Sequence, residues 1–269
     1  MATIGNVWNM TESKSFDAAA QPDIHALDFY LAGPHPCNYL PGRMAGTLYA
    51  DPYQPTSTAL YSRLIDHGFR RSGEYLYRPH CQGCEACIPV RIPVAEFQPT
   101  RNQLRTWQRN QDLTVRAMAG LYREDHFHLY QRYLASRHPG GGMDGTAPEQ
   151  YQSFLLCAGL DTQLYEFRNG DQLLAVAVTD HLEQGLSAVY TFFDPAQPTR
   201  SLGRYSILWQ IHEAQRLGLP WLYLGYWIKE CRKMSYKDEY HPLETYLHGR
   251  WSRMVAPATL VLPCTSEEN

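Results

Sequence analysis

A two-residue turn, Asn169-Gly170, constrains the fold of this chain more than any other short segment. It joins two strand-like runs, TQLYEFR (162–168) and QLLAVAVTDHL (172–182). An Asn-Gly pair between such runs is the strongest short-range signal for a β-hairpin. A second turn, Glu183-Gln184-Gly185, leads into LSAVYTFFDP (186–195) and predicts a third strand. The second half of the chain is therefore expected to contain an antiparallel meander.

A helix and one further strand are expected after this meander. Apolar residues recur on one face of a helix from about residue 202 to 217, and glycine and proline end it (Ile207, Ile211, Ala214, Leu217; Gly218, Pro220). The aromatic run WLYLGYWI (221–228) then predicts a strand. Before the meander, residues 121–137 show a helical pattern that HPGGG ends. A meander followed by a helical crossover to another strand predicts an α+β fold.

The order of these elements matches the acyltransferase fold of the GNAT type, and one loop adds a more specific likeness. Between the third meander strand and the helix, that fold carries Arg/Gln-x-x-Gly-x-Gly/Ala, and this chain reads RSLGRY (200–205). The free amides of such a loop and the helix N-terminus can hold phosphate oxygens. Tyr205 replaces the final small residue, which narrows the space for a coenzyme A pyrophosphate.

Three evenly spaced cysteines mark the first half of the chain, within YRPHCQGCEACIPVRIP (77–93). Zinc takes four thiolate or imidazole ligands, and a four-iron cluster takes four cysteines, of which bacterial ferredoxins space three in this way. Cys37, in a proline-rich loop, is the best candidate for the fourth ligand, with His35 and His80 in reserve. The sequence therefore predicts a metal site, holding an iron–sulfur cluster or zinc, at Cys37, Cys81, Cys84 and Cys87.

Length and composition narrow the class of protein. A chain of 269 residues with 44% hydrophobic content can bury a substantial core and is expected to form two modules. We expect a loose leader (1–23), a smaller cysteine-containing α/β module (24–110), a GNAT-like transferase domain (111–255) and a tail (256–269). The sequence has neither a long apolar run nor a secretory pattern, which predicts a cytoplasmic protein with reduced thiols. A net charge of −3 predicts no generally basic surface.

Several long segments resemble one known family: CNYLPGR (37–43), GFRRSGEYLYRPHCQGCEACIPVRIPVAEFQPTR (68–101), RYLASRHPGGGM (132–143), LSAVYTFFDP (186–195), RSLGRYSIL (200–208) and YLGYWIKECRKMSYKDEYHPLE (223–244). They resemble the aminoacyl-tRNA–protein transferases of the N-end rule pathway, and within these the bacterial aspartate/glutamate leucyltransferases. The likeness covers about residues 25–255. The eukaryotic members differ in the cysteine cluster, where they carry C-x₂-C and a Cys-Cys pair.

This resemblance implies a function and two GNAT-like modules, with a cysteine cluster in the first. Leucine would pass from leucyl-tRNA to the α-amine of proteins that begin with Asp or Glu, which marks them for degradation. The implied partners are leucyl-tRNA and these acceptor proteins, with no membrane. No cofactor is needed for the chemistry, and the cysteine cluster is reported in the family to hold iron–sulfur or zinc.

The chemistry of this reaction suggests which residues act. An aminoacyl ester is already activated, so the protein mainly positions the reactants and stabilises the developing oxyanion. A free α-amine has a pKa of about 7.7–8.0, so a group that orients it suffices. Asp194 and Tyr190, on the third meander strand, are the candidates for this role. Arg70 and Arg71 are the candidates for reading the acceptor's carboxylate, because the guanidinium fork binds carboxylates in bidentate fashion.

Basic residues of the second half are the candidates for binding tRNA. Phosphates of the acceptor end could meet the RSLGRY loop and the lysines that follow the last predicted strand (Arg200, Gly203, Arg204, Lys229, Lys233, Lys237). Trp227 and Tyr236 lie among these lysines and could stack on unpaired bases.

Three other functions compete with leucyl transfer. Arginyl-tRNA could be the donor for the same acceptors. The fold pattern alone also suits a coenzyme A-dependent N-acetyltransferase. The cysteines alone would suit a metal-cluster sensor or an RNA-binding module without catalysis.

Overall fold

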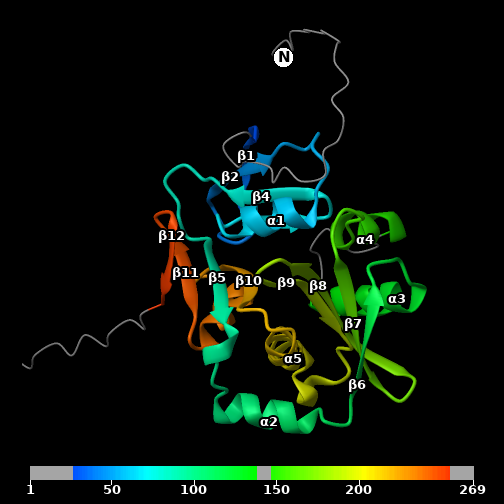
Figure 1. Cartoon of the computed structure of the whole chain (residues 1–269). Helices are drawn as coiled ribbons and strands as arrows, with labels where there is room; N and C mark the ends of the chain where they lie inside the picture. The colour runs from blue at the N-terminus through cyan, green and yellow to red at the C-terminus, as the bar shows by residue number, and fades with distance from the viewer. Residues whose placement is uncertain (1–26, 138–146, 255–269) are drawn as a thin grey trace, which may run out of the picture.

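A computed structural model describes residues 27–137 and 147–254 (Figure 1). The expected leader and tail, and the HPGGG segment, lie outside the described residues. Within them the chain is a mixed α+β structure, as predicted, with two sheets and helices packed around the larger one.

The smaller sheet belongs to the first part of the chain. It is four-stranded and antiparallel, in the order β1-β2-β4-β3. Its strands are β1 (Phe29–Pro36), β2 (Met44–Ala50), β3 (Arg70–Ser72) and β4 (Tyr75–Pro79). The segment between β2 and β3 forms α1 (Thr58–Ile65), which begins at the N-cap Ser57 and packs its apolar side into a core with Phe69 and Leu76.

The larger sheet has eight strands in the order β12-β11-β5-β10-β9-β8-β7-β6. They are β5 (Ile88–Pro93), β6 (Thr114–Ala119), β7 (Thr162–Asn169), β8 (Gln172–Leu182), β9 (Gly185–Phe193), β10 (Trp221–Trp227), β11 (Glu244–Leu247) and β12 (Arg250–Arg253). The sequence did not reveal β5, which precedes residue 111 and pairs with both β10 and β11. The larger sheet therefore contains a strand from each side of the expected boundary at residues 110 and 111. The division of the chain into two modules stays a prediction.

Helices cover both faces of the larger sheet. They are α2 (Arg101–Arg109), α3 (Glu124–Arg137), α4 (Pro148–Leu155), α5 (Leu202–Arg216) and the short α6 (Arg232–Ser235), with single 3₁₀ turns at η2 (Val94–Glu96), η3 (Pro198–Arg200) and η4 (Tyr236–Glu239). Successive residues of β8 point to opposite faces. Val176 and Val178 pack with α3 and α4, whereas Ala175 and Ala177 pack with α5. The helices α3 and α5 therefore lie on opposite sides of the sheet.

The predicted meander is confirmed. β7 and β8 pair antiparallel up to Asn169 and Gln172, so only Gly170 and Asp171 form the turn. Gly170 adopts φ +57°, a left-handed conformation that glycine reaches without strain. β8 and β9 form the second hairpin, and α5 then crosses to β10, which lies parallel to β9.

β9 and β10 separate after a short parallel pairing. Their register covers only Gly185–Ser187 against Trp221–Tyr223, although β9 continues to Phe193 and β10 to Trp227. Each strand also has a bulge next to the point of separation. In β9 the pairing with β8 skips Val189, and in β10 the pairing with β5 skips Leu224. Such bulges bend a strand and strengthen its twist. We call the space between the separated ends of the two strands the β9/β10 gap.

A buried ion pair joins the smaller sheet to the larger one. Arg71 of β3 donates from Nε and Nη2 to the two carboxylate oxygens of Asp180 on β8, the latter bond at 2.7 Å. Both side chains are fully buried, and Thr162 also donates to Asp180. This bidentate geometry compensates for the cost of burying two charges.

We predict that Arg71→Met lowers the free energy of unfolding by about 3–5 kcal/mol, because the buried Asp180 carboxylate loses its counter-ion. Denaturant unfolding monitored by circular dichroism measures the change. Arg253→Met is the matched control, since it removes an exposed ion pair with Glu96 and should leave stability nearly unchanged. Equal losses in the two variants would contradict the structural role of Arg71.

Candidate functional site

Arg70 fills part of the β9/β10 gap. Its Nη2 donates to the backbone oxygen of Val189 at 3.0 Å, and its guanidinium lies 5.9 Å from the centre of the Tyr226 ring. Val189 is the bulged residue of β9, so its carbonyl is free of the sheet pairing. Among the described residues, Arg70 has no carboxylate partner. A cation held between two diverging strands without a counter-ion is suited to bind an anionic group of a ligand.

Gly225 makes room for this guanidinium. Its φ is +75°, and a Cβ built on it would lie 2.1 Å from Arg70 Nη1. No other residue could occupy this position of β10 without displacing Arg70. The sequence analysis did not identify Gly225 or Val189. The available signal was the glycine within an aromatic strand, because glycine inside a strand marks a bulge or a close approach of another group.

Aromatic side chains line the gap on the α3 side. Tyr190 packs edge-on against Tyr130 of α3, at 6.0 Å between ring centroids, and against Phe154 of α4, at 5.5 Å. Burial raises the pKa of the Tyr190 hydroxyl, so it stays protonated and can donate a hydrogen bond. Tyr190 therefore packs against α3 and α4 next to the bulge at Val189, and its part in the reaction stays a prediction.

Asp194 lies where the chain leaves β9. One carboxylate oxygen accepts the backbone N–H of Ala196 at 3.1 Å, which makes Asp194 the first residue of a turn. The side chain is buried and has no cationic partner in the described part of the chain. Its role in orienting the amine stays a prediction.

Two of the proposed binding residues have other roles in the structure. Arg71 is held in the buried pair with Asp180, so it is a structural residue rather than an accessible carboxylate reader. Lys237 is only 5% exposed and donates from Nζ to the backbone oxygen of Tyr226. Burial holds the pKa of Lys237 well below its usual value, and an RNA phosphate cannot reach it in this position.

The remaining candidates for tRNA binding are divided between paired and exposed side chains. Arg200 forms a bidentate pair with Asp112, and Arg204 pairs with Glu239. Gly203 packs against the Phe193 ring, since a Cβ there would lie 3.1 Å from it. Lys229 and Lys233 are exposed on the segment after β10. The sequence had not indicated the neutralising partners of the two arginines, because they are remote in the chain.

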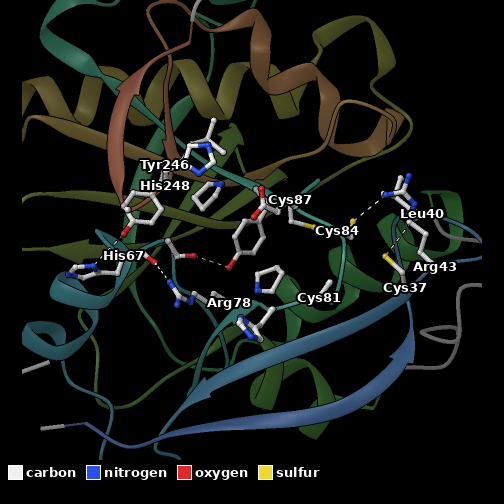
Figure 2. A pocket seen from close by; sticks show the side chains of 18 of the residues that line it. Cys37, Leu40, Arg43, His67, Arg78, Cys81, Cys84, Cys87, Tyr246 and His248 are labelled. Atoms are coloured by element: carbon white, nitrogen blue, oxygen red, sulfur yellow. Dashed lines mark hydrogen bonds between the residues drawn. The ribbon is translucent and has the colours of Figure 1, made fainter. Parts of the chain in front are cut away.

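The four predicted metal ligands line one cavity of about 350 Å³ (Figure 2). Cys37 and Cys84 lie beside Arg43 and Leu40, while His67 and Tyr246 line the opposite end of the cavity. Cys37 Sγ accepts the backbone N–H of Leu40 at 3.4 Å, and Cys84 Sγ accepts from Arg43 at 3.2 Å. Cys37, Cys84 and Cys87 also pack against the segment that follows β10, at Ile228 and Cys231.

The electrostatics of these thiols fit a bound cation. Hydrogen bonds from the Ala86 backbone N–H and from Arg43 lower the pKa of Cys84, which favours its thiolate. Burial, and then the charges of the other three cysteines, raise the pKa of Cys87 to about 12. A metal would relieve this repulsion. The four cysteines could therefore hold a metal centre.

The four sulfur atoms are spread along the cavity, and no three of them lie within 4.8 Å of one another. Which metal centre they would hold, an iron–sulfur cluster or zinc, stays a prediction.

A compact group at Asp125, His126 and Glu166 has ligand atoms within 4.8 Å of one another, but its surroundings do not suit a cation. Glu166 already accepts from His126 Nε2 and Arg168 Nε, each at 2.6 Å. Arg168 also pairs with Asp125. The group is therefore an ion-pair network that joins α3 to β7.

Comparisons with known proteins agree with one another. Residues 35–105 match the family model described as arginine-tRNA-protein transferase, N terminus, and residues 125–247 match its C-terminus model. Three curated relatives are each called aspartate/glutamate leucyltransferase. The protein of Pseudomonas fluorescens (strain Pf0-1) is 53% identical over 85% of this chain and 97% of its own length. The protein of Nitrosococcus oceani is 54% identical over 84% of this chain and 95% of its own length. The protein of Thiobacillus denitrificans is 50% identical over 88% of this chain and 98% of its own length.

Solved structures resemble the chain only weakly. The C-terminal domain of a putative lysylphosphatidylglycerol synthetase from Agrobacterium fabrum has a TM-score of 0.40 at 14% identity, over 65% of this chain and 53% of its own. L-PGS from Bacillus licheniformis has a TM-score of 0.42 at 8% identity, over 61% and 50%. Among the described residues, no helix is long and apolar enough to cross a membrane.

We predict that Cys84 is the first of the four cluster cysteines to be alkylated by iodoacetamide at neutral pH in metal-free protein, because its lowered pKa gives it the largest thiolate fraction. Mass spectrometry of labelled peptides measures the order. Arg43→Gln should slow this reaction, and reconstitution with iron and sulfide, or with zinc, should protect all four cysteines. Equal labelling of the cluster with and without metal would contradict the predicted centre.

Proposed function

The chain belongs to the aspartate/glutamate leucyltransferase family, and we propose that it transfers leucine from leucyl-tRNA to N-terminal Asp or Glu in the β9/β10 gap. One observation carries this location. The gap holds Arg70, a cation without a counter-ion in the described structure, at the place where two parallel strands separate. An acidic acceptor supplies the missing charge, and its α-amine then lies close to the same gap.

A GNAT-like fold is part of this proposal. From α3 onward the chain contains the predicted elements in the predicted order, with α4 in addition: the meander β7–β8–β9, the crossover helix α5 and the parallel strand β10. The separation of β9 from β10 supports the assignment, because the two parallel strands stop pairing toward the end of β9 from which the chain passes to α5. Open sheets bind ligands in such crevices at the carboxyl ends of their strands.

The residues of the gap can assist aminolysis without a strong base. The ester is the activated reactant, and the neutral fraction of the acceptor α-amine attacks its carbonyl carbon. Arg70 would hold the acceptor's side-chain carboxylate, and Asp194 would accept a hydrogen bond from the amine. Tyr190 would shape the wall and donate to an oxygen of the ester. The 3′ hydroxyl of the terminal adenosine is the leaving group.

We also propose roles for the cysteines and for the cell compartment. Cys37, Cys81, Cys84 and Cys87 would hold an iron–sulfur cluster or zinc that supports the segment after β10, which Cys37, Cys84 and Cys87 contact. Leucyl-tRNA is a cytoplasmic donor, and the leucine-bearing product would enter the N-end rule pathway of degradation.

The coenzyme A alternative is less well supported. Arg200 and Arg204, which would face a pyrophosphate, are already neutralised by Asp112 and Glu239. Tyr205 is buried against Trp107 and Phe167, so this side chain belongs to the core of α5.

We predict that purified protein transfers labelled leucine from leucyl-tRNA to peptides that begin with Asp or Glu. Peptides that begin with Asn or Gln should accept far less, since they lack the carboxylate. Parallel reactions with arginyl-tRNA and with acetyl-CoA identify the donor. Transfer of arginine alone, or of acetyl groups alone, would reject the proposed reaction, and binding of tRNA without any transfer would favour a non-catalytic module.

We predict that Arg70→Gln lowers kcat/KM for Asp-initial peptides by about 10- to 150-fold, which corresponds to one charged hydrogen bond of about 1.5–3 kcal/mol. The ratio of Asp-initial to Asn-initial transfer should fall by a similar factor, whereas a general loss of folding would leave that ratio unchanged. Arg253→Gln is the control, because Arg253 lies on β12 and forms an exposed ion pair with Glu96. An unaltered ratio in Arg70→Gln would reject this arginine as the acceptor reader.

A further inference from the structure

Three arginines form a stripe along α2. Arg101, Arg105 and Arg109 are four residues apart in RNQLRTWQR, so they lie on one face with about 6 Å of helix between neighbours. All three are exposed, and the helix contains no acidic residue. We call these residues the α2 arginine stripe.

The opposite face of α2 is fixed by polar anchors. Gln103 Nε2 donates to the backbone oxygen of Glu239 at 3.1 Å, and Asn110 Nδ2 donates to that of Arg200 at 2.9 Å. Trp107 packs between them on Tyr205 and His212 of α5. Because this inner face is fixed, the stripe is held outward, toward solvent.

These anchors hold α2 on the outer side of α5, against the segments that follow β9 and β10. Its first turn is bonded to the segment that follows β10, through Gln103 and Glu239. Its last turn is bonded to the segment that follows β9, because Arg109 donates to Thr199 and Asn110 to Arg200. The helix therefore bridges the two segments that leave the separating strands, on the α5 side of the sheet (Figure 1).

The charge of the stripe is not neutralised nearby. None of its three arginines forms an ion pair within the described residues. The carboxylates closest to the ends of the helix, Asp112 and Glu239, are engaged by Arg200 and Arg204. A protein of net charge −3 thus presents an uncompensated row of three cations beside its proposed active site.

We propose that the α2 arginine stripe binds backbone phosphates of the tRNA acceptor arm and so directs its 3′ end into the β9/β10 gap. This inference rests on the proposed function and adds the surface that holds the donor. Evenly spaced guanidinium groups on a rigid helix suit a polyanion with regularly spaced charges, and such contacts give affinity without reading sequence. The α5 side would then receive the donor, leaving the α3 side to the acceptor.

The test compares R101Q/R105Q/R109Q with the parent protein for binding of purified leucine-accepting tRNA. Three lost phosphate contacts should weaken binding at least tenfold near 0.1 M salt. They should also reduce the slope of log affinity against log salt by about 2–3. The variant R101Q/R105Q keeps the Arg109–Thr199 bond and should reduce the slope by about 1.5–2, which covers the case in which the triple variant does not fold.

A control variant and a leucine donor without the acceptor arm distinguish loss of tRNA binding from loss of leucine transfer. R116Q/R216Q/R250Q removes the same charge from β6, the far end of α5 and β12, and should leave the slope nearly unchanged. With the leucyl ester of adenosine, which lacks the acceptor arm, the stripe variants should transfer leucine at the parental rate. Parental tRNA affinity and slope in both stripe variants would overturn the inference, as would an equal loss in the control. Failure of the parent itself to transfer leucine would instead refute the proposed function.

Discussion

The separation of β9 from β10 is the constraint on which the proposed site depends. Two parallel strands that pair over three residues and then diverge leave backbone groups without sheet partners, and such groups require compensation. The protein supplies it from another part of the chain, because Arg70 donates to the carbonyl of Val189 and fits against the bare backbone of Gly225. The place where the strands separate thereby carries a positive charge. If β9 and β10 stayed paired along their whole length, their backbone groups would be satisfied, but no ligand could bind between them.

Two adjacent arginines of β3 contact the larger sheet in different ways. Arg71 is neutralised by Asp180 and fixes β3 against β8, so the position of Arg70 follows from a rigid, buried contact. The cysteine module restrains the same region from the other side, since it packs on the chain just after β10. The smaller sheet therefore acts as a support that carries one functional side chain into the larger sheet. In this arrangement the predicted metal ligands and the residues of the proposed transfer site are separate sets of side chains.

Much of the larger sheet could be predicted because its signals are local. The hairpin and the 3.6-residue periodicity of α5 depend only on neighbours in sequence, and the structure confirms both, with the turn one residue later than predicted, at Gly170 and Asp171. The role of Arg71 could not be predicted, because its partner lies 109 residues away. The same holds for β5, whose neighbours β10 and β11 follow it by more than a hundred residues. The cysteines were recognisable from spacing alone, whereas the location of Arg70 depends on how two strands diverge, which no sequence pattern records.

The central claim is that the leucyl ester is presented to the acceptor within the β9/β10 gap. The most direct measurement is a crystal structure of the protein bound to a short CCA oligonucleotide whose 3′ end carries leucine through a stable amide. The account predicts that the leucyl carbonyl lies between β9 and β10, beside Val189 and within reach of Arg70. A complex in which the leucyl group occupies the cysteine-lined cavity, or in which packed side chains close the gap, would contradict it.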